Sequence, residues 1–298
     1  MPPVISVIIP NYNSEQQLEE TLRRLSVERE TSGIAAEIIV VDNGSEAPPE
    51  ALCAQYNFVT LAHEPTPGPG PARSKGAALA RGTYLAFIDA DCYPMPGWLT
   101  AVKEGLDSGV DVVGGDVRIA FRNPEHLDMI EAYEAVYGYN NKHYVTVNGY
   151  TGTGNMGVRA ASFAKVGDFA GLSVAEDIDW GKRAKAAGLT IRYLPDMIVE
   201  TPARESYDEL IRKWDRHIAH LYEARSSDVK WALRGVAMAL SPPAEILRVA
   251  KSTRISGLRA RWLAWICVTR TRFYRARRML ELAFGRDADA LAARWRDD

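Results

Sequence analysis

The sequence predicts an α/β fold in which a mostly parallel sheet is flanked by helices and followed by a helical C-terminal region. Short apolar runs alternate with helical segments over roughly the first 110 residues, which is typical of a parallel sheet covered on both faces. From residue 229 the pattern is helical, with a break at Ser241-Pro242-Pro243. We therefore expect one α/β domain over residues 1–225 and a basic amphipathic helical region over residues 226–298.

Composition indicates an ordinary globular protein, since 47% of the 298 residues are hydrophobic and 25% are charged. The three cysteines have no paired or metal-ligand spacing, which favours a reducing compartment. The N-terminus lacks a basic stretch followed by an apolar one, so no secretory signal is expected. No apolar run reaches the length of about 18 residues that a membrane span requires. These features predict a cytoplasmic protein.

The elements follow from apolar periodicity and from turn residues. Strands are expected at residues 4–9, 37–41, 58–61, 84–88 and 190–194. Helices are expected at residues 14–25, 50–56, 72–81, 124–139, 160–166, 178–187 and 207–224. The stretch 65–71 contains so much proline and glycine that we expect no regular element there.

Polar residues follow three of the expected strands, at Asn11-Tyr12-Asn13, Asp42-Asn43 and Asp89-Ala90-Asp91. In a parallel sheet these strand ends share one edge and can form a single crevice. Arg73 and Lys75 open the helix after the proline-rich loop, where positive charge and a helix N-terminus suit a pyrophosphate. Each feature alone also fits a solvated loop end; their joint occurrence favours a binding site.

Asp89 and Asp91 stand two residues apart directly after a buried strand. Two carboxylates this close repel unless a cation or a proton lies between them. Mg²⁺ or Mn²⁺, which prefer oxygen ligands and often bind together with phosphates, are the simplest occupants. The alternative is that both acids cap the helix expected to start near Gly97.

Glu176 and Asp177 open another expected helix, ahead of Ile178 and Trp180. Acids in the first turn agree with the helix dipole, which gives them a structural explanation. Beside apolar residues they are also suited to hold a general base in a partly desolvated site, and the crevice upstream favours this function.

Five motifs in this order resemble the family-2 glycosyltransferases of the GT-A fold, which is Rossmann-like. They are Ser6-Val-Ile-Ile-Pro-Asn-Tyr-Asn13, Ile39-Val-Val-Asp-Asn-Gly-Ser45, Pro71-Ala-Arg-Ser-Lys-Gly76, Ala86-Phe-Ile-Asp-Ala-Asp91 and Glu176-Asp177. The resemblance covers about residues 4–224. It implies metal-dependent, inverting transfer of a sugar from a nucleotide sugar, expected to be UDP-linked, to an acceptor hydroxyl.

The resemblance also assigns roles to individual residues. It implies that Asp42 contacts the nucleotide base, Asp89 the ribose, and Asp91 the Mg²⁺ or Mn²⁺ on the donor diphosphate. Asp177 is the expected catalytic base. The complete expected donor-binding set is Pro10, Asn11, Asn13, Asp42, Asn43, Arg73, Lys75 and Asp89. The expected acceptor-side set is Gly154, Asn155, Glu176 and Trp180, with Gly154 and Asn155 in the acceptor-side loop 152–157.

The chain departs from the family pattern at three points. Ser74 stands where many relatives have asparagine, and the histidine that often follows the strand after the Glu-Asp helix is absent. Arg204 is a candidate to contact the diphosphate in its place, and His217 is a second candidate metal ligand. Residues 209–214 lack the glutamine and the Arg-Trp pair of processive synthases, so we expect transfer of one or a few sugars.

Two other functions fit parts of the pattern. A nucleotidyltransferase acting on a sugar phosphate also uses a metal-bound diphosphate, but it releases pyrophosphate. A catalytically inactive nucleotide-sugar-binding protein would keep the donor site without turnover.

The C-terminal region is strongly basic. Residues 246–280 contain ten arginine or lysine residues and no acid, so this segment carries about +10 and the rest of the chain about −12, given a net charge of −2. Apolar residues recur there at helical spacing, at Leu258, Trp262, Trp265, Ile266, Phe273, Leu280 and Phe284.

Such a helix is typical of peripheral contact with an anionic membrane, here through residues 246–284. The alternatives are docking on the acidic catalytic domain and, less favoured by the apolar stripe, nucleic-acid binding, so we expect no nucleic-acid partner. Membrane contact implies a lipid or lipid-linked glycan as acceptor, a place on the inner face of the cell membrane, and a role in cell-envelope glycan biosynthesis.

Overall fold

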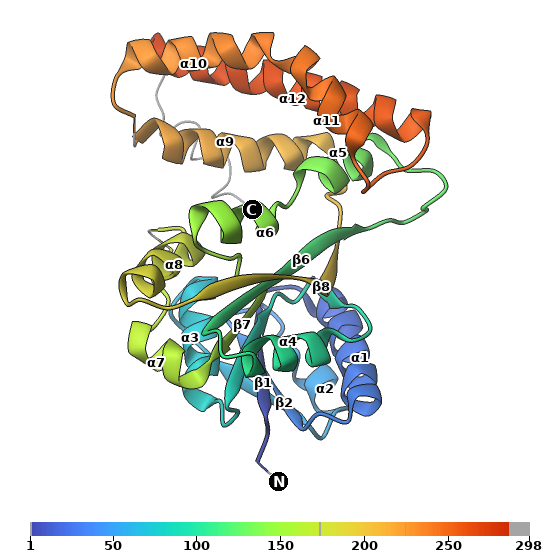
Figure 1. The fold of residues 1–298 in the computed structure, drawn as a ribbon, viewed down its shortest axis with the longest axis vertical. Coiled ribbons are helices and arrows are strands. Elements are labelled where there is room, and N and C mark those ends of the chain that lie inside the picture. Colours follow the sequence, from blue (N-terminus) through green and yellow to red (C-terminus); the bar gives the residue numbers. More distant parts are fainter. Residues whose placement is uncertain (1, 173, 224, 286–298) are drawn as a thin grey trace. The chain divides into compact units, whose positions relative to one another are not determined.

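The fold is described from a computed structural model that covers residues 2–172, 174–223 and 225–285 (Figure 1). The chain forms two compact units. Unit 1 comprises Met1–Arg118 and Asn140–Thr201, and unit 2 comprises Ile119–Tyr139 together with the chain from Pro202 onward. The chain thus enters unit 2 twice, and the C-terminal helices pack with segments from before residue 225. The expected domain boundary between residues 225 and 226 stays a prediction.

The described residues of the chain form one eight-stranded sheet in the order β3-β2-β1-β4-β7-β6-β8-β5. The strands are β1 (Ile5–Asn11), β2 (Ala36–Asp42), β3 (Val59–His63), β4 (Tyr84–Ile88), β5 (Tyr93–Pro94), β6 (Val112–Ala120), β7 (Asn155–Arg159) and β8 (Ile191–Pro202).

The first half of this sheet brings three polar strand ends to one edge. β3, β2, β1 and β4 are parallel neighbours, and β7 then pairs with β4 in the antiparallel sense. Asn11 at the end of β1 lies beside Asp42 at the end of β2, while Asp89 follows directly after β4. The expected crevice edge is therefore present, because parallel strands end on the same side of a sheet.

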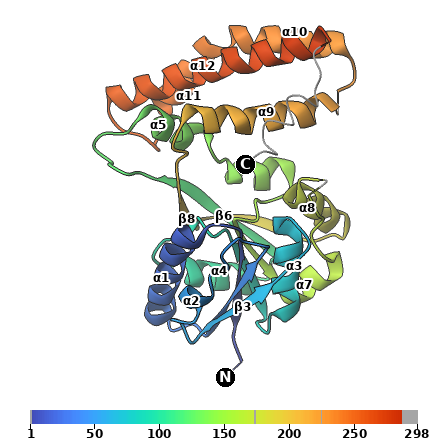
Figure 2. The ribbon, with the colours of Figure 1, turned by 180° about the vertical axis from the view of Figure 1, so that it is seen from behind.

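Helices cover both faces of the sheet (Figures 1 and 2). Those of unit 1 are α1 (Glu15–Ser32), α2 (Glu50–Cys53), α3 (Pro69–Leu79), α4 (Trp98–Asp107), α6 (Asn141–His143), the π-helical turn η1 (Tyr144–Asn148), α7 (Ala160–Val166) and α8 (Glu176–Ala186). Val7 and Ile9 pack with α1 and α4, whereas Ile8 packs on the other face in a cluster that includes Phe163 of α7 and Trp180 of α8. Full burial of each such side chain contributes about 1.5–3 kcal/mol. Alternate side chains of β1 thus pack on opposite faces of the sheet, which confirms the expected α/β architecture.

Several elements differ from the sequence expectation. α1 continues to Ser32, past the expected end at residue 25, and β6 and β7 were not among the expected strands. α3 begins at Pro69, inside the stretch expected to be irregular, because proline is well suited to the first helical position. β8 continues to Pro202, well beyond the expected strand at 190–194, and lies between β6 and β5 in the sheet. α5 (Met129–Tyr137) begins later than expected, since Asp128 and Glu131 form a capping box.

Unit 2 is helical. With α5 it contains α9 (Tyr207–Glu223), α10 (Asp228–Leu240), the 3₁₀ turn η2 (Pro242–Ala244), α11 (Glu245–Lys251) and α12 (Leu258–Ala283). Trp231 of α10 is buried with Ile218 of α9 and Met279 of α12, and its indole N–H donates to the Met279 carbonyl at 2.9 Å. Among the described helices, none is long and apolar enough to cross a membrane.

The buried face of α12 is not the apolar stripe expected from the sequence. It consists mainly of small side chains, including Ala260, Ala264 and Cys267, which allow close approach of neighbouring helices. Several of the larger stripe residues instead face solvent, namely Leu258, Trp262, Phe273 and Phe284. The helix therefore packs in unit 2 through one face and exposes much of another.

Candidate active site

Asp42 is held in place as a carboxylate at the end of β2. It is buried, accepts a hydrogen bond from the Asn11 amide at 3.2 Å, and accepts two more from the backbone N–H groups of Gly44 and Ser45. Burial raises the pKa of Asp42. The hydrogen bonds, together with one that the Ser45 hydroxyl donates, outweigh the effect of burial and lower this pKa below its ordinary value. Asp42 is thus a fixed anionic acceptor, the chemistry needed to receive N–H groups of a nucleobase.

Two other expected donor residues build the loops around Asp42. The Asn43 side chain accepts from the Gly68 N–H at 2.6 Å and donates to the carbonyls of Glu64 and Thr66, so it fixes the loop before α3. Asn13, at a positive φ of 48°, accepts from the Glu46 N–H. Their side chains therefore shape the crevice edge, and Pro10 precedes Asn11 within β1.

Arg73 connects two motifs that lie far apart in the sequence. Its side chain is buried, donating to Asp89 Oδ1 at 2.5 Å and to Glu176 Oε1 at 2.8 Å. Burial opposes its charge, but the two carboxylates raise the pKa of Arg73 above the ordinary value. The strand-end acids and the helix that carries Asp177 thus belong to one site.

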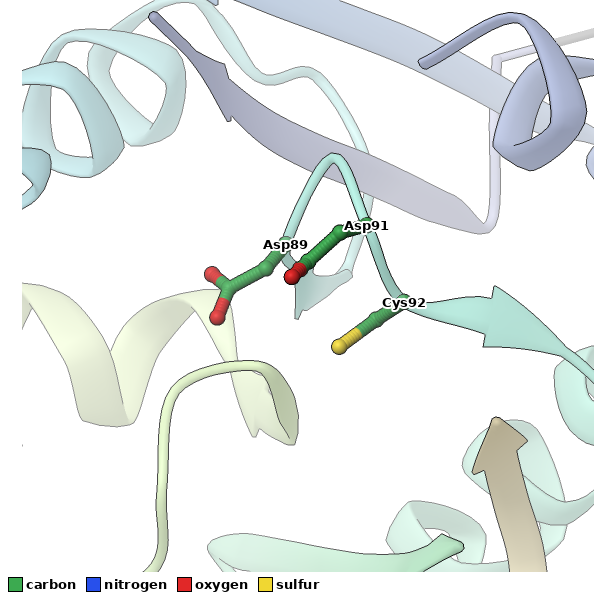
Figure 3. Close-up of side chains that lie close together, drawn as sticks. All are labelled: Asp89, Asp91 and Cys92. Atoms are coloured by element: carbon green, nitrogen blue, oxygen red, sulfur yellow. The ribbon is translucent and has the colours of Figure 1, made fainter. Parts of the chain in front are cut away.

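Asp89, Asp91 and Cys92 project from the turn between β4 and β5 (Figure 3). Their potential ligand atoms all lie within 4.8 Å of one another. Burial, and then the nearby charges of Asp91 and Asp89, raise the pKa of the Cys92 thiol well above its ordinary value. The remaining donors are carboxylate oxygens, which fit a hard divalent cation such as Mg²⁺ or Mn²⁺. Arg73 binds Asp89 Oδ1, and the assignment of Asp91 as the metal ligand stays a prediction.

The helix-capping explanation of the two acids is wrong. At the start of α4, the N–H groups of Gly97 and Leu99 donate instead to the two oxygens of Glu28, at 2.9 and 3.1 Å. Thr21 on the same helix as Glu28 donates to the Ala90 carbonyl at 2.7 Å and so holds the turn between the two acids. Thr21 and Glu28 were not predicted from the sequence. Their only signal there is that they are polar residues on the helix face expected to be buried.

The acceptor-side loop 152–157 lies directly against the acid turn. A Cβ atom on Gly154 would come within 2.6 Å of Asp89 Oδ2, so any other residue there would require the Asp89 side chain, which Arg73 binds, to shift. Asn155 is fully buried; its amide donates to the carbonyls of Asp116 and Met197 and its oxygen accepts from Trp98. Asn155 thus has a structural role, not the expected contact with an acceptor.

Trp180 also differs from its expected acceptor-side role. Only 2% of its surface is exposed, and its ring packs among Phe163 and Phe169 in the core. Its indole N–H donates to the Gly167 carbonyl at 2.9 Å. Trp180 therefore anchors α8 to the sheet, because its position one turn after Glu176 puts it on the helix face that is turned inward.

Asp177 has the environment of a proton acceptor. It is half-buried in the first turn of α8, and burial, followed by the charge of Glu176, raises its pKa above the ordinary value despite Arg73. Tyr144 and Tyr150 stack with ring centres 5.3 Å apart, and both lie close enough for the Asp177 charge to contribute to their raised pKa values, after burial. This aromatic pair was missed because η1 has no sequence signature.

Three further candidates remain less defined. Lys75 is exposed on α3, two residues from Arg73. Arg204 forms an ion pair with the buried Glu134 within unit 2. His217 lies on α9, also in unit 2, with its ring 5.5 Å from that of Trp214. The roles of these three residues toward a diphosphate or a metal stay predictions.

Known proteins resemble this chain along most of its length. Residues 6–167 match the model of the glycosyl transferase family 2. Glycosyltransferase AglE from Haloferax volcanii is 31% identical over 218 residues, which cover 71% of this chain and 70% of AglE.

Solved structures share the fold. The mannosyltransferase PcManGT from Pyrobaculum calidifontis, in complex with GDP-Man and Mn²⁺, superposes with a TM-score of 0.54 at 18% identity, covering 98% of this chain and 79% of its own. Glucosyl-3-phosphoglycerate synthase from Mycobacterium tuberculosis, in complex with Mn²⁺, UDP and phosphoglyceric acid, gives a TM-score of 0.52 at 20% identity, covering 74% and 78%. With the family match, the fold is that of the GT-A glycosyltransferases, and the chain belongs to glycosyl transferase family 2.

Proposed function

We propose that this glycosyltransferase uses a divalent metal and a nucleotide sugar, expected to be UDP-linked, and inverts the configuration of the transferred sugar. The observation that carries the proposal is the buried Arg73 bridge between Asp89 and Glu176. It joins a donor end, with Asp42, Asp89 and Asp91, to a base end, with Asp177. The two solved structures hold Mn²⁺ with GDP-Man in one and with UDP in the other, which supports a nucleotide donor and a divalent metal.

The reaction is a single displacement. The acceptor hydroxyl oxygen forms a bond to the anomeric carbon while its proton passes to the Asp177 carboxylate. The bond from that carbon to the diphosphate oxygen breaks, and the nucleoside diphosphate leaves with the electron pair. A bound Mg²⁺ or Mn²⁺ would supply charge neutralisation for this leaving group, with Asp91 as its protein ligand. One base and one displacement invert the anomeric configuration.

The acceptor is proposed to be a hydroxyl of a glycan or of a lipid-linked sugar. The stacked Tyr144–Tyr150 pair beside Asp177 supports a sugar-bearing acceptor, because the negative faces of aromatic rings attract the C–H edges of a pyranose. We propose one or a few transfers per acceptor, in cell-envelope glycan synthesis on the inner face of the cell membrane.

The nature of the released product tests the reaction class. Incubation of the protein with UDP-glucose, UDP-N-acetylglucosamine and GDP-mannose in Mn²⁺ is expected to release a nucleoside diphosphate, slowly to water and faster with acceptor. Nucleoside triphosphate with sugar 1-phosphate is the comparison. Pyrophosphate release from that mixture would indicate a nucleotidyltransferase, and no turnover of any donor would favour a binding protein.

The pH dependence of transfer reports the raised pKa of Asp177. Transfer requires the unprotonated carboxylate, so activity falls as pH drops through this pKa. Because burial and Glu176 raise it, the acid limb of kcat/KM for the acceptor is expected above the ordinary aspartate value of about 3.9. Asp42 titrates lower and does not contribute to this limb. A limb at or below the ordinary value would contradict Asp177 as the base.

A further inference from the structure

The outer face of α10 is apolar although it faces solvent. Val229, Leu233, Val236 and Leu240 are between 45% and 75% exposed, and their spacing of four, three and four residues puts them in one row along the helix. A helix on the surface of a globular unit ordinarily shows polar residues on this side. The row is therefore an exposed apolar surface of the kind that marks an interaction site.

The opposite face of α10 is fixed in unit 2. Trp231 is buried and hydrogen-bonded to Met279, and a Cβ atom on Gly235 would come within 3.3 Å of Leu280 and Met279. Rotation of α10 to hide the row would expose this packed side. Beyond the Ser241-Pro242-Pro243 break, Ile246 and Leu247 of α11 are also exposed, at 50% and 65%.

The charge around this row is positive. Residues 225–262 include eight arginine or lysine residues and two acids. Both acids are bound within unit 2, Asp228 by Arg225 and Glu245 by Arg272. At 100° per residue, exposed Lys230 and Arg234 lie along one flank of the row, whereas Ala232 and Ala239 lie along the other.

We propose that α10 and α11 are a membrane-docking surface, whose partner is an anionic lipid bilayer. The apolar row enters the boundary between headgroups and acyl chains, and Lys230 and Arg234 contact lipid phosphates. Charge complementarity selects lipid over a second copy of the chain, because two copies of this face would bring like charges together. This docking surface rests on the membrane placement in the proposed function. It assigns the membrane contact to α10 and α11 and not to the apolar stripe on α12.

Co-sedimentation of the full-length protein with vesicles tests the surface. Phosphatidylcholine vesicles containing about 30% phosphatidylglycerol are expected to bind it, and pure phosphatidylcholine much less. The double variant Leu233→Ser, Leu240→Ser lowers the partition constant by about a hundredfold, since burial of one leucine shifts an equilibrium about tenfold. Lys230→Glu with Arg234→Glu lowers binding to the anionic vesicles by about tenfold or more and removes the preference for them.

Val27→Ser with Leu79→Ser is the matched control, because these exposed residues of α1 and α3 lie in unit 1. It is expected to bind vesicles like the wild type, and every variant is expected to keep the thermal unfolding temperature and the hydrolysis of soluble donor.

Loss of turnover with intact vesicle binding would count against the proposed reaction alone. No binding of the wild-type protein to anionic vesicles, or unchanged binding of the leucine variant, overturns the docking surface. A wild-type dimer that the leucine variant converts to a monomer, without vesicle binding, would instead assign the face to self-association.

Discussion

Asp177→Asn is expected to lower kcat for sugar transfer by about a thousandfold, the contribution of a positioned general base. Asparagine keeps the shape of the side chain but cannot accept the acceptor proton. The donor end is untouched, so the KM for the nucleotide sugar stays near that of the wild type. Steady-state assays with varied donor and acceptor measure both constants.

The same variant is expected to keep or raise the stability of the protein. The raised pKa means that the folded state holds the Asp177 proton more tightly than the unfolded chain. Stability therefore falls as pH rises through the interval between the two pKa values, and at neutral pH the ionised group opposes folding. Loss of activity with an unchanged or higher melting temperature thus separates a catalytic from a structural effect.

Asp179→Asn is the matched control for Asp177. It lies two residues further along α8 and forms an ion pair with Arg183, four residues away on the same helix, at 2.9 Å. Such a pair contributes little to stability, and we expect nearly wild-type kcat. Equal losses in the two variants, or turnover by Asp177→Asn like that of the wild type, would remove Asp177 as the base.

Asp91→Asn is expected to raise the Mn²⁺ concentration that gives half-maximal activity by more than about a hundredfold, since loss even of an outer partner of a metal site costs 10–100-fold. Asp91 does not bind Arg73, and a thermal unfolding scan of the variant checks that the fold is kept. Electron paramagnetic resonance of free Mn²⁺, titrated with protein and UDP, measures the affinity without turnover.

Cys92→Ala provides the comparison within the same group of three side chains. Because Mn²⁺ and Mg²⁺ prefer oxygen ligands to sulfur, we expect removal of the thiol to leave the Mn²⁺ dependence unchanged. A shift as large as that of Asp91→Asn would make the sulfur a ligand. Wild-type Mn²⁺ affinity in Asp91→Asn would assign the metal elsewhere.

Much of the fold was predictable because its signals are local. Apolar runs gave the first four strands, and Asp42, Asp89 and Asp91 follow strands whose parallel order makes their ends share an edge. Where an element depends on partners distant in sequence, prediction was poorer. β8 extends well past its apolar start, and the larger residues of the stripe on α12 are exposed because small residues on another face make the helix contacts.

The roles of individual residues were likewise predictable where they depend on local sequence and poorly predictable where they depend on distant contacts. Residue types indicated a base within the pair Glu176 and Asp177, and the family resemblance assigned it to Asp177. The raised pKa of Asp177 depends first on burial, which is not a property of the local sequence, and then on the charge of Glu176. Trp180 and Asn155 were expected at the acceptor and lie in the core, since helix phase and strand pairing decide which way a side chain points. Glu28 caps α4 from 69 residues away in the chain, a contact without a sequence signature.

The sequence by itself determined the α/β class, the family and the acids that follow neighbouring strands, because strand periodicity and motif order depend on residues that are close in sequence. Only the tertiary structure decided that Arg73 joins Asp89 to Glu176, across 16 and 103 residues of chain, and that a capping role for the acid pair is excluded. It also decided which face of the basic helices meets solvent. The physical reason is that burial and ion pairing arise from contacts between distant segments, and those contacts exist only once the chain has folded.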